Sequence, residues 1–312
     1  MYHGVISVYK EKGYTSFDVV AKLRGILKQK KIGHTGTLDP DAEGVLVVCL
    51  GRATKLCGLL TDKSKTYEAV LLLGKTTDTE DSSGTVLSSC EVTATPEEIR
   101  ETILSFKGEY EQIPPMYSAI KVNGKRLYEL AREGEVIERS PRKVIIHDIQ
   151  IQKIEIPYVT FTVSCGKGTY IRSLCRDIGE KLGCGGIMDR LIRNSVNATE
   201  TGMVFTREKS HTLDKIEKLV ENQEFETHIF PIDAMFPQLI KCYVNEDGNK
   251  KLYNGNLLKT KDFKDVIEKP EDGEKFLVYD TDNVFCAIYQ YQDKLHGFKA
   301  EQMFLMNDRK NC

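Results

Sequence analysis

Long apolar runs are missing from this sequence of 312 residues, because no run reaches the roughly 18 residues that a helix needs to cross a bilayer. The first residues, Met1-Tyr2-His3-Gly4, also lack the pattern of a secretory signal peptide. With 40% hydrophobic and 29% charged residues, the composition is that of an ordinary globular protein. We therefore expect a cytoplasmic protein that does not enter a membrane.

Cysteine pairs at metal-ligand spacing are also missing. The nine cysteines are scattered along the chain, none forms a C-x-x-C pair, and no histidine lies at ligand spacing from a cysteine. These absences argue against a zinc site and against a disulfide framework. We predict no metal and no other cofactor, and we expect most of the thiols to be small core residues in a reducing compartment.

Two common phosphate-binding motifs, G-x-x-x-x-G-K-S/T and G-x-G-x-x-G, do not occur. A different glycine-rich stretch, described below, could still cradle an anion. An aspartate at the end of that stretch would repel phosphate, so a phosphate-binding enzyme is a weak alternative. Nothing in the chain indicates a coiled coil or an obvious dimer face, and we expect a monomer without a protein partner.

The net charge of −2 argues against a generic nucleic-acid binder, but the charges are unevenly distributed. Residues 1–65 hold 11 Lys and Arg against 6 Asp and Glu, and residues 120–210 hold 16 against 11. Residues 66–119 hold 3 against 10, and residues 211–312 hold 14 against 19. The two basic blocks could form one basic face in the folded protein. They could equally be solvated surface without a partner.

Hydrophobic periodicity predicts an α+β fold with a mixed or antiparallel sheet flanked by helices. Strands are expected at residues 4–10, 45–50, 65–74, 143–156 and 159–164. Capping boxes at Thr15 and Thr95 predict two helix starts, and the stripe of residues 171–182 predicts a third helix. We place a linker near residues 230–233, which divides the chain into domains 1–230 and 231–312. Strands at 275–279 and 284–291 predict a small β domain after the linker.

The most distinctive stretch lies between the first helix and the strand at 45–50, and reads Gly33-His34-Thr35-Gly36-Thr37-Leu38-Asp39-Pro40. Two glycines within four residues allow a tight turn or a close approach of a ligand to the backbone. Pro40 biases Asp39 away from helical geometry, so its carboxylate is held in an extended or turn conformation. Composition alone would favour an ordinary surface turn. Only the neighbouring motifs change that interpretation.

Further motifs follow in a fixed order: Gly13-x-Thr15-Ser16, Lys65-x-Tyr67, Pro114-Pro115-x-Tyr117-Ser118-Ala119-x-Lys121 and Gly168-Thr169-Tyr170-Ile171-Arg172. Together with the loop they cover about residues 4 to 195. In this set the chain resembles the bacterial tRNA pseudouridine synthases of the TruB family. That resemblance implies isomerisation of a tRNA T-arm uridine (position 55 in tRNA numbering) to pseudouridine.

The resemblance also implies three catalytic roles. Asp39 would be the carboxylate that attacks, or assists the departure of, the uracil, which then rotates and rejoins through carbon. Arg172 would pair with Asp39 and keep it ionised and oriented. A surface arginine near a helix start is the plainer alternative for Arg172. Tyr67 would stack under the target base and could transfer a proton, whereas the residue pattern alone indicates an ordinary strand tyrosine.

Substrate contacts are implied for His34, Gly36, Thr37, Lys10 and Leu191. His34 resembles the family histidine that fills the space left by flipped bases, and flipping is needed because a stacked uridine is out of reach. A solvated loop histidine is the plainer alternative. Leu191 would line the uracil pocket, although a core leucine is nearly as good an interpretation. Lys10 matches a motif lysine, with a surface role as the alternative, and Glu11 stands where the family has proline.

The last domain resembles the small PUA-like β-barrel of the same family, which touches the acceptor end of tRNA. Its excess of acidic residues makes phosphate attraction poor, so a structural role is an equal alternative. The expected partner is therefore tRNA, through the T arm; the resemblance of the last domain implies the acceptor end as a second contact. A protein that binds and folds tRNA, with non-essential isomerase activity, is the alternative function.

Overall fold

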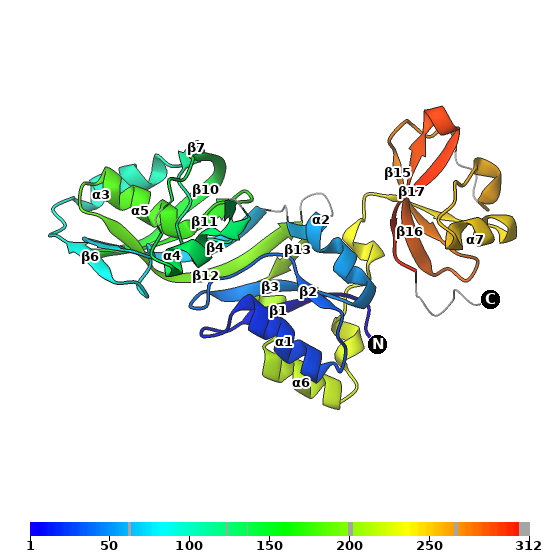
Figure 1. The fold of residues 1–312 in the computed structure, drawn as a ribbon, viewed down its shortest axis with the longest axis horizontal. Helices are drawn as coiled ribbons and strands as arrows, with labels where there is room; N and C mark the ends of the chain where they lie inside the picture. Colours follow the sequence, from blue (N-terminus) through cyan, green and yellow to red (C-terminus); the bar gives the residue numbers. More distant parts are fainter. Residues whose placement is uncertain (62–63, 123, 136, 199–201, 265–267, 306–312) are drawn as a thin grey trace.

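The computed structural model describes residues 1–61, 64–122, 124–135, 137–198, 202–264 and 268–305. Two units follow one another along the chain, a large one built on a long twisted sheet and a smaller C-terminal one (Figure 1). In the described part of the chain no helix is both long enough and apolar enough to cross a membrane.

The large sheet has nine strands, in the order β1-β3-β12-β4-β11-β10-β7, with β2 added to β3 and β13 to β12. Among the described residues of this sheet only β3 and β12 run parallel, and the other neighbouring strands are antiparallel. The predicted mixed sheet is therefore confirmed. Its strands are β1 Gly4–Lys10, β2 Ile32–His34, β3 Glu43–Leu50, β4 Ser64–Leu73, β7 Gly108–Gln112, β10 Arg142–Glu155, β11 Tyr158–Cys165, β12 Gly186–Ala198 and β13 Met203–Thr206.

All five strands expected in this unit are present within one or two residues of their predicted bounds. The central strand β12 was not predicted from the sequence. Its residues neither alternate regularly between polar and apolar nor form an apolar run. In the structure β12 pairs with β3 on one side and β4 on the other, and its two register shifts against β4 interrupt the alternation of side chains.

The three helices expected at Thr15, at Thr95 and on the stripe 171–182 are present as α1 Ser16–Ile26, α3 Pro96–Leu104 and α5 Ile171–Lys181. The hydroxyl oxygens of Thr15 and Thr95 accept from backbone N–H groups of Asp18 and Glu98, whose carboxylates accept in return from the two threonine N–H groups. The other helices are α2 Cys57–Thr61, α4 Leu127–Arg132, α6 Leu213–Glu221 and α7 Glu246–Tyr253.

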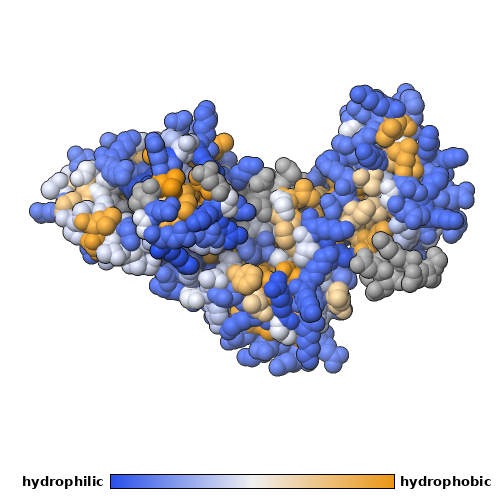
Figure 2. Space-filling view, in the orientation of Figure 1, coloured by the Kyte–Doolittle hydropathy of each residue, from blue (hydrophilic) through white to orange (hydrophobic). Residues whose placement is uncertain are grey.

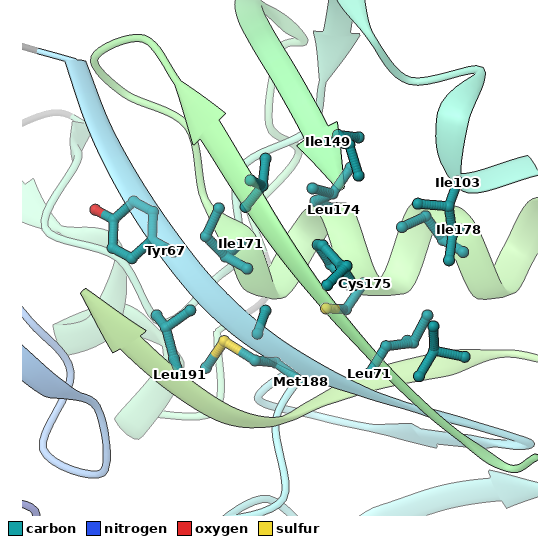
Figure 3. Packing of buried hydrophobic residues seen from close by; sticks show 14 of the residues in the cluster. Tyr67, Leu71, Ile103, Ile149, Ile171, Leu174, Cys175, Ile178, Met188 and Leu191 are labelled. Atoms are coloured by element: carbon teal, nitrogen blue, oxygen red, sulfur yellow. The ribbon is translucent and has the colours of Figure 1, made fainter. Parts of the chain in front are cut away.

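Helices cover both halves of the sheet. On the half formed by β4, β10, β11 and β12, α5 and α3 pack their apolar side chains against the strands (Figure 3). On the half formed by β1 and β3, α1 and α6 pack side by side (Figure 1). Two hairpins extend from the sheet, β5 Lys75–Thr77 with β6 Val86–Ser89, and β8 Lys121–Val122 with β9 Lys125–Arg126.

The C-terminal unit contains a four-stranded sheet in the order β14-β15-β16-β17. Its strands are β14 Ile240–Tyr243, β15 Lys275–Tyr279, β16 Phe285–Gln292 and β17 Gly297–Met303, so the two strands expected here are confirmed. Among the described residues this sheet does not close into a barrel.

The two units share a core. Val5 and Val47 of the large sheet lie in one buried cluster with Leu277 and Phe304 of the C-terminal unit. Arg52 donates from Nη1 to the carbonyl oxygen of Phe304 at 2.8 Å. The C-terminal unit is therefore packed against the large unit through apolar side chains and one hydrogen bond. Figure 2 shows that one face of the molecule is mostly hydrophilic, with apolar side chains in separate patches.

Candidate active site

The loop that carries Asp39 lies between β2 and β3 and is fastened to the start of α1. Leu38 is buried, and its N–H donates to the hydroxyl oxygen of Ser16 at 2.9 Å. The N–H of Gly13 donates to the carbonyl oxygen of Pro40 at 3.0 Å. These contacts hold the backbone on both sides of Asp39, so the position of its Cα atom is fixed.

Asp39 and Arg172 meet in a two-pronged ion pair. Arg172 Nε lies 3.0 Å from one carboxylate oxygen, and Nη2 donates to the other at 3.2 Å. Such fork-to-fork geometry fixes the orientation of a carboxylate as well as its position. The structure thus brings together two residues that lie 133 positions apart in the sequence.

The guanidinium of Arg172 is also held from behind. Nη1 donates to the carbonyl oxygen of Thr79 at 3.0 Å, and Nη2 donates to that of Tyr117 at 2.8 Å. The carboxylate of Asp81 lies 3.7 Å from Nη1. The Arg172 side chain is only 6% exposed, which excludes the alternative of a solvated surface arginine.

The pKa of Asp39 is raised above its ordinary value, chiefly because burial disfavours the charged carboxylate. Attraction by Arg172 is the largest opposing effect, repulsion by Asp81 adds to the rise, and Lys10 lowers the pKa again. From the sequence we expected the charge of Arg172 to keep Asp39 ionised and so to lower its pKa. The Asp39 side chain nevertheless keeps 37% of its exposure, so its carboxylate remains open to an incoming group.

Lys10 is completely buried and binds the backbone of the loop that carries Asp39. Its ammonium donates to three carbonyl oxygens, those of Glu11 at 3.1 Å, Pro40 at 3.0 Å and Ala42 at 2.6 Å. The surface role considered for Lys10 is therefore excluded. Burial lowers the pKa of Lys10 to about 8, although Asp39 and other nearby carboxylates oppose the shift.

A pH-dependent stability difference follows from this lowered pKa. Between about pH 8 and the ordinary value of 10.5, the unfolded chain binds a proton at Lys10 that the folded chain has released. The wild type should therefore gain stability relative to Lys10→Met as the pH rises through that window, by at most about 3 kcal/mol. Urea unfolding of both proteins from pH 7 to 10 measures the difference. A difference that stays constant with pH would contradict this prediction.

Tyr67 on β4 and Leu191 on β12 are diagonal neighbours, because Tyr67 is paired with Arg193 and Leu191 with Ala69; Figure 3 shows both side chains in one buried cluster. Both are buried and belong to the cluster that includes Leu38 of the loop. Burial raises the pKa of Tyr67, and Arg193 opposes the rise through its charge and a hydrogen bond. The Tyr67 hydroxyl therefore stays protonated at neutral pH, and its ring forms one wall beside the loop.

His34 stands at the end of β2, where the loop begins. It is half-buried, and its Nδ1 atom is buried without a hydrogen-bond partner among the described residues. Burial, together with repulsion from Arg193, lowers the pKa of His34, so the ring is neutral at pH 7. A neutral ring with an unpaired nitrogen is suited to stack or to accept a hydrogen bond.

Arg193 organises the loop but was not recognised as a functional residue from the sequence. This arginine of β12 is buried and donates to the carbonyl oxygens of Val45 at 2.6 Å, Gly36 at 3.1 Å and Thr37 at 3.4 Å. It pairs across the sheet with both Gly44 and Tyr67. Its guanidinium therefore connects the glycine-rich loop to β3, while its backbone lies between β3 and β4.

Arg193→Lys should loosen this loop without removing the charge. A lysine ammonium cannot reach all three carbonyl oxygens in the planar pattern of a guanidinium, so at least one buried carbonyl loses its partner. We expect the free energy of unfolding to fall by about 2 kcal/mol. Chemical denaturation measures this loss, with the exposed Arg100→Lys as the matched control. Equal stability of the two variants would contradict the role given to Arg193.

Glu80 was also not recognised from the sequence, and it anchors the segment that contacts Arg172 to helix α5. Glu80 is buried, accepts from the Ser173 hydroxyl at 2.7 Å and forms a very short ion pair with Arg176. The sequence around Glu80 reads as a polar loop, and nothing local marks it as buried. Through Glu80 the segment that presents Thr79 and Asp81 to Arg172 is tied to the helix that carries Arg172.

Among the described residues no cluster of three or more His, Cys, Asp or Glu could hold a metal ion. None of the eight described cysteines forms a disulfide, and all but Cys57 and Cys90 are buried. Their expected place in the core is thereby confirmed. Cys312 lies outside the described residues.

Comparison with known proteins assigns the chain to a family. The family model described as TruB family pseudouridylate synthase (N terminal domain) matches residues 24–171, and the tRNA pseudouridylate synthase B C-terminal domain matches residues 172–237. A protein of Lachnoclostridium phytofermentans named tRNA pseudouridine synthase B is 55% identical, over 97% of this chain and 100% of that protein. One of the same name from Alkaliphilus oremlandii is 46% identical, over 93% and 94%.

A solved Cbf5-Nop10-Gar1 complex contains a chain of the same fold, with a TM-score of 0.69 and 26% identity over 98% of this chain and 86% of that chain. The class is therefore that of the pseudouridylate synthases, which are isomerases. Within this class the chain belongs to the TruB family, and the resemblance noted in its motifs is confirmed.

Proposed function

We propose that this enzyme converts the uridine at position 55, in the T arm of tRNA, to pseudouridine. The observation that carries the proposal is the Asp39–Arg172 pair, a carboxylate held by two hydrogen-bonding contacts and still partly open to solvent. The relatives described above are named as tRNA pseudouridine synthases, which supports tRNA as the substrate.

The reaction breaks the bond between uracil N1 and the sugar carbon and forms a bond from uracil C5 to the same carbon. Asp39, in its ionised form, either attacks or assists the departure of the base, which turns before it rejoins. The proton on C5 is lost and N1 gains one, so atoms and charge balance without a cofactor. Arg172 favours the ionised form of Asp39 and fixes its two oxygens.

The remaining candidates have distinct roles in this proposal. Tyr67 would stack under the flipped uracil and transfer a proton, and Leu191 would line the pocket; their place in one buried cluster supports these roles. His34 fills the space that the flipped base leaves, and the backbone at Gly36 and Thr37 borders the substrate. Lys10 acts through the loop, because its ammonium is buried against three carbonyl oxygens.

At the level of domains, we propose a catalytic domain of residues 1–230 and a PUA-like domain of residues 231–312. The open four-stranded sheet and the separate core around Val278 and Phe298 support a distinct second domain. Its contact with the acceptor end of tRNA, a monomeric state and action in the cytoplasm complete the proposal.

Tritium release tests the proposed reaction directly. Uracil C5 exchanges its hydrogen for carbon during isomerisation, so a tRNA transcript labelled with tritium at C5 should release label to water in the presence of the enzyme. The matched control is a transcript in which cytidine replaces the uridine at position 55, labelled in the same way at its uridines. Release from the first transcript alone is expected. Equal release from both would overturn the position, and release from neither would overturn the function.

A further inference from the structure

A basic cavity of about 300 Å³ lies at the outer edge of β1, separate from the residues of the candidate active site. It forms where two later segments return to β1. His211 bridges to Val8, and Phe230 bridges to Val5 through hydrogen bonds of 2.8 Å in both directions. Its lining consists of Lys209, His211, Thr227, His228, Ile229 and Phe230.

Two imidazoles meet in this cavity. Nε2 of His211 lies 3.0 Å from Nδ1 of His228, and the rings are nearly perpendicular, with centroids 4.6 Å apart. A hydrogen bond between two ring nitrogens requires that one donates while the other is unprotonated and accepts. The pair therefore holds its hydrogen bond only while at least one of the two rings is neutral.

Positive charge surrounds the histidine pair. Lys209 lines the cavity from the 3-10 turn η2 (Arg207–Lys209), and Lys215 acts on His211 from α6. The lining contains no acidic residue, and the exposed carboxylate of Glu208 is bonded to the hydroxyl of Thr206 and to its own backbone. Burial, His228 and Lys215 together lower the pKa of His211. A second cation in the pair thus becomes favourable only when an anion enters.

The donors and walls of the cavity define the anion. The Thr227 hydroxyl already donates to the carbonyl oxygen of Glu224 at 2.8 Å, which leaves the Lys209 ammonium and the imidazole N–H groups as donors. Ile229 and Phe230 form an apolar wall, and Phe230 is packed edge-to-face on Phe205 at 5.6 Å. The volume lies at the lower end of small-ligand sites, with room for a phosphate and an attached sugar.

We propose that this cavity binds a phosphate group through Lys209 and the His211–His228 pair. The phosphate can come from the RNA backbone, as a diester that would anchor the substrate away from the reacting uridine, or from a free phosphate ion. The RNA source rests on the proposed function, whereas the binding of free phosphate does not depend on it.

The first experiment follows the histidine ring protons of the full-length protein by NMR between pH 5 and 8, with and without inorganic phosphate. His211→Gln and His228→Gln assign the two signals. Bound phosphate should raise the titration midpoint of His211 by about one pH unit and move the ring-proton signals of both histidines. Lys209→Gln should abolish that shift, and Lys294→Gln, an exposed lysine of the C-terminal unit, should preserve it.

The second experiment measures tRNA affinity against salt concentration for the same variants. If the occupant is an RNA phosphate, Lys209→Gln weakens binding and lowers the salt slope by about one, while Lys294→Gln leaves it unchanged. A phosphate-induced shift without a change in the salt slope identifies free phosphate as the occupant. Unchanged histidine midpoints together with an unchanged slope would overturn the proposal. Tritium release is measured on each variant, so a failure of the isomerase function is recognised separately.

Discussion

Asp39→Asn is expected to reduce tritium release from labelled tRNA below detection while leaving tRNA affinity within about twofold of the wild type. Asparagine keeps the size of the side chain and one acceptor oxygen, so Arg172 retains a hydrogen-bond partner and the loop keeps its anchors at Leu38 and Pro40. It cannot act as a nucleophile, and it lacks the negative charge that would stabilise the cationic sugar carbon left when the base departs.

Asp41→Asn is the matched control for this prediction. Asp41 lies two residues further along the same loop, its side chain is 59% exposed, and its contact with Lys12 is a loose surface ion pair of 3.9 Å. The same chemical change there should leave turnover near the wild-type value, because exposed pairs contribute little. Comparable losses in both variants would mean that loop charge in general, and not the Asp39 carboxylate, is responsible.

Asp39→Asn also distinguishes the two functions that the sequence left open, tRNA isomerisation and the binding and folding of tRNA. A protein whose main role is to bind and refold tRNA should keep that effect in the Asp39→Asn form, even though the chemistry is lost. Retained tritium release by Asp39→Asn would instead contradict the proposed mechanism at its first step. Refolding of a misfolded tRNA transcript, measured by its subsequent aminoacylation, is the readout for the second function.

Signals confined to a few neighbouring residues predicted this protein best. The capping boxes at Thr15 and Thr95 depend on contacts three residues apart, and both occur as predicted. The loop around Asp39 was recognised by the order of its residues together with the neighbouring motifs, because its composition alone is that of a surface turn. Where structure is decided within one turn or one loop, the sequence carries the information openly.

Contacts that depend on distant segments were not predictable. Arg193 is a charged residue in the middle of a buried strand, and it is stable there only because the carbonyl oxygens of Gly36, Thr37 and Val45 surround it. Glu80 is buried for a similar reason, since Ser173 and Arg176 reach it across more than 90 residues of chain. No local pattern distinguishes such residues from solvated ones.

The electrostatics of Asp39 show the same limit. From the sequence, Arg172 was the only charge that could be assigned to Asp39, which suggested a low pKa. The fold adds burial and the carboxylate of Asp81, and their combined effect raises the pKa of Asp39. The sequence therefore supplied the correct pair of residues without the balance of energies between them.

Arg172→Met is expected to lower turnover by a factor of about 100 to 1,000, a loss typical of removing a fixed charged donor from an active site. The guanidinium contacts both oxygens of Asp39 and the carbonyl oxygens of Thr79 and Tyr117. Methionine preserves much of the buried volume but none of these contacts. Arg172→Lys keeps the charge without the fork, and we expect it to recover only a small part of the activity.

The pH dependence of the variants distinguishes a lost charge from a disturbed fold. Arg172 is the largest influence that lowers the pKa of Asp39, against burial and Asp81. Without it the pKa of Asp39 rises further, so more of the enzyme carries the inactive, protonated carboxyl at a given pH. The acid limb of the kcat/KM profile should therefore move to higher pH in Arg172→Met and less far in Arg172→Lys. An unshifted limb with a uniformly lower rate would contradict this account.

The raised pKa of Asp39 also makes the free energy of unfolding depend on pH. Because the folded pKa of Asp39 is raised, the folded protein binds its proton more tightly than the unfolded chain, and stability falls as the pH rises through the folded pKa. Removing Arg172 enlarges that fall and leaves Asp39 near Asp81 without the cation between them. At pH 7.5 we expect Arg172→Met to lose about 2 kcal/mol, a value kept below that of a fully buried pair because Asp39 is 37% exposed. Lowering the pH to 5.5 should recover part of the loss, whereas Arg100→Met, an exposed change on α3, should be nearly neutral at both values.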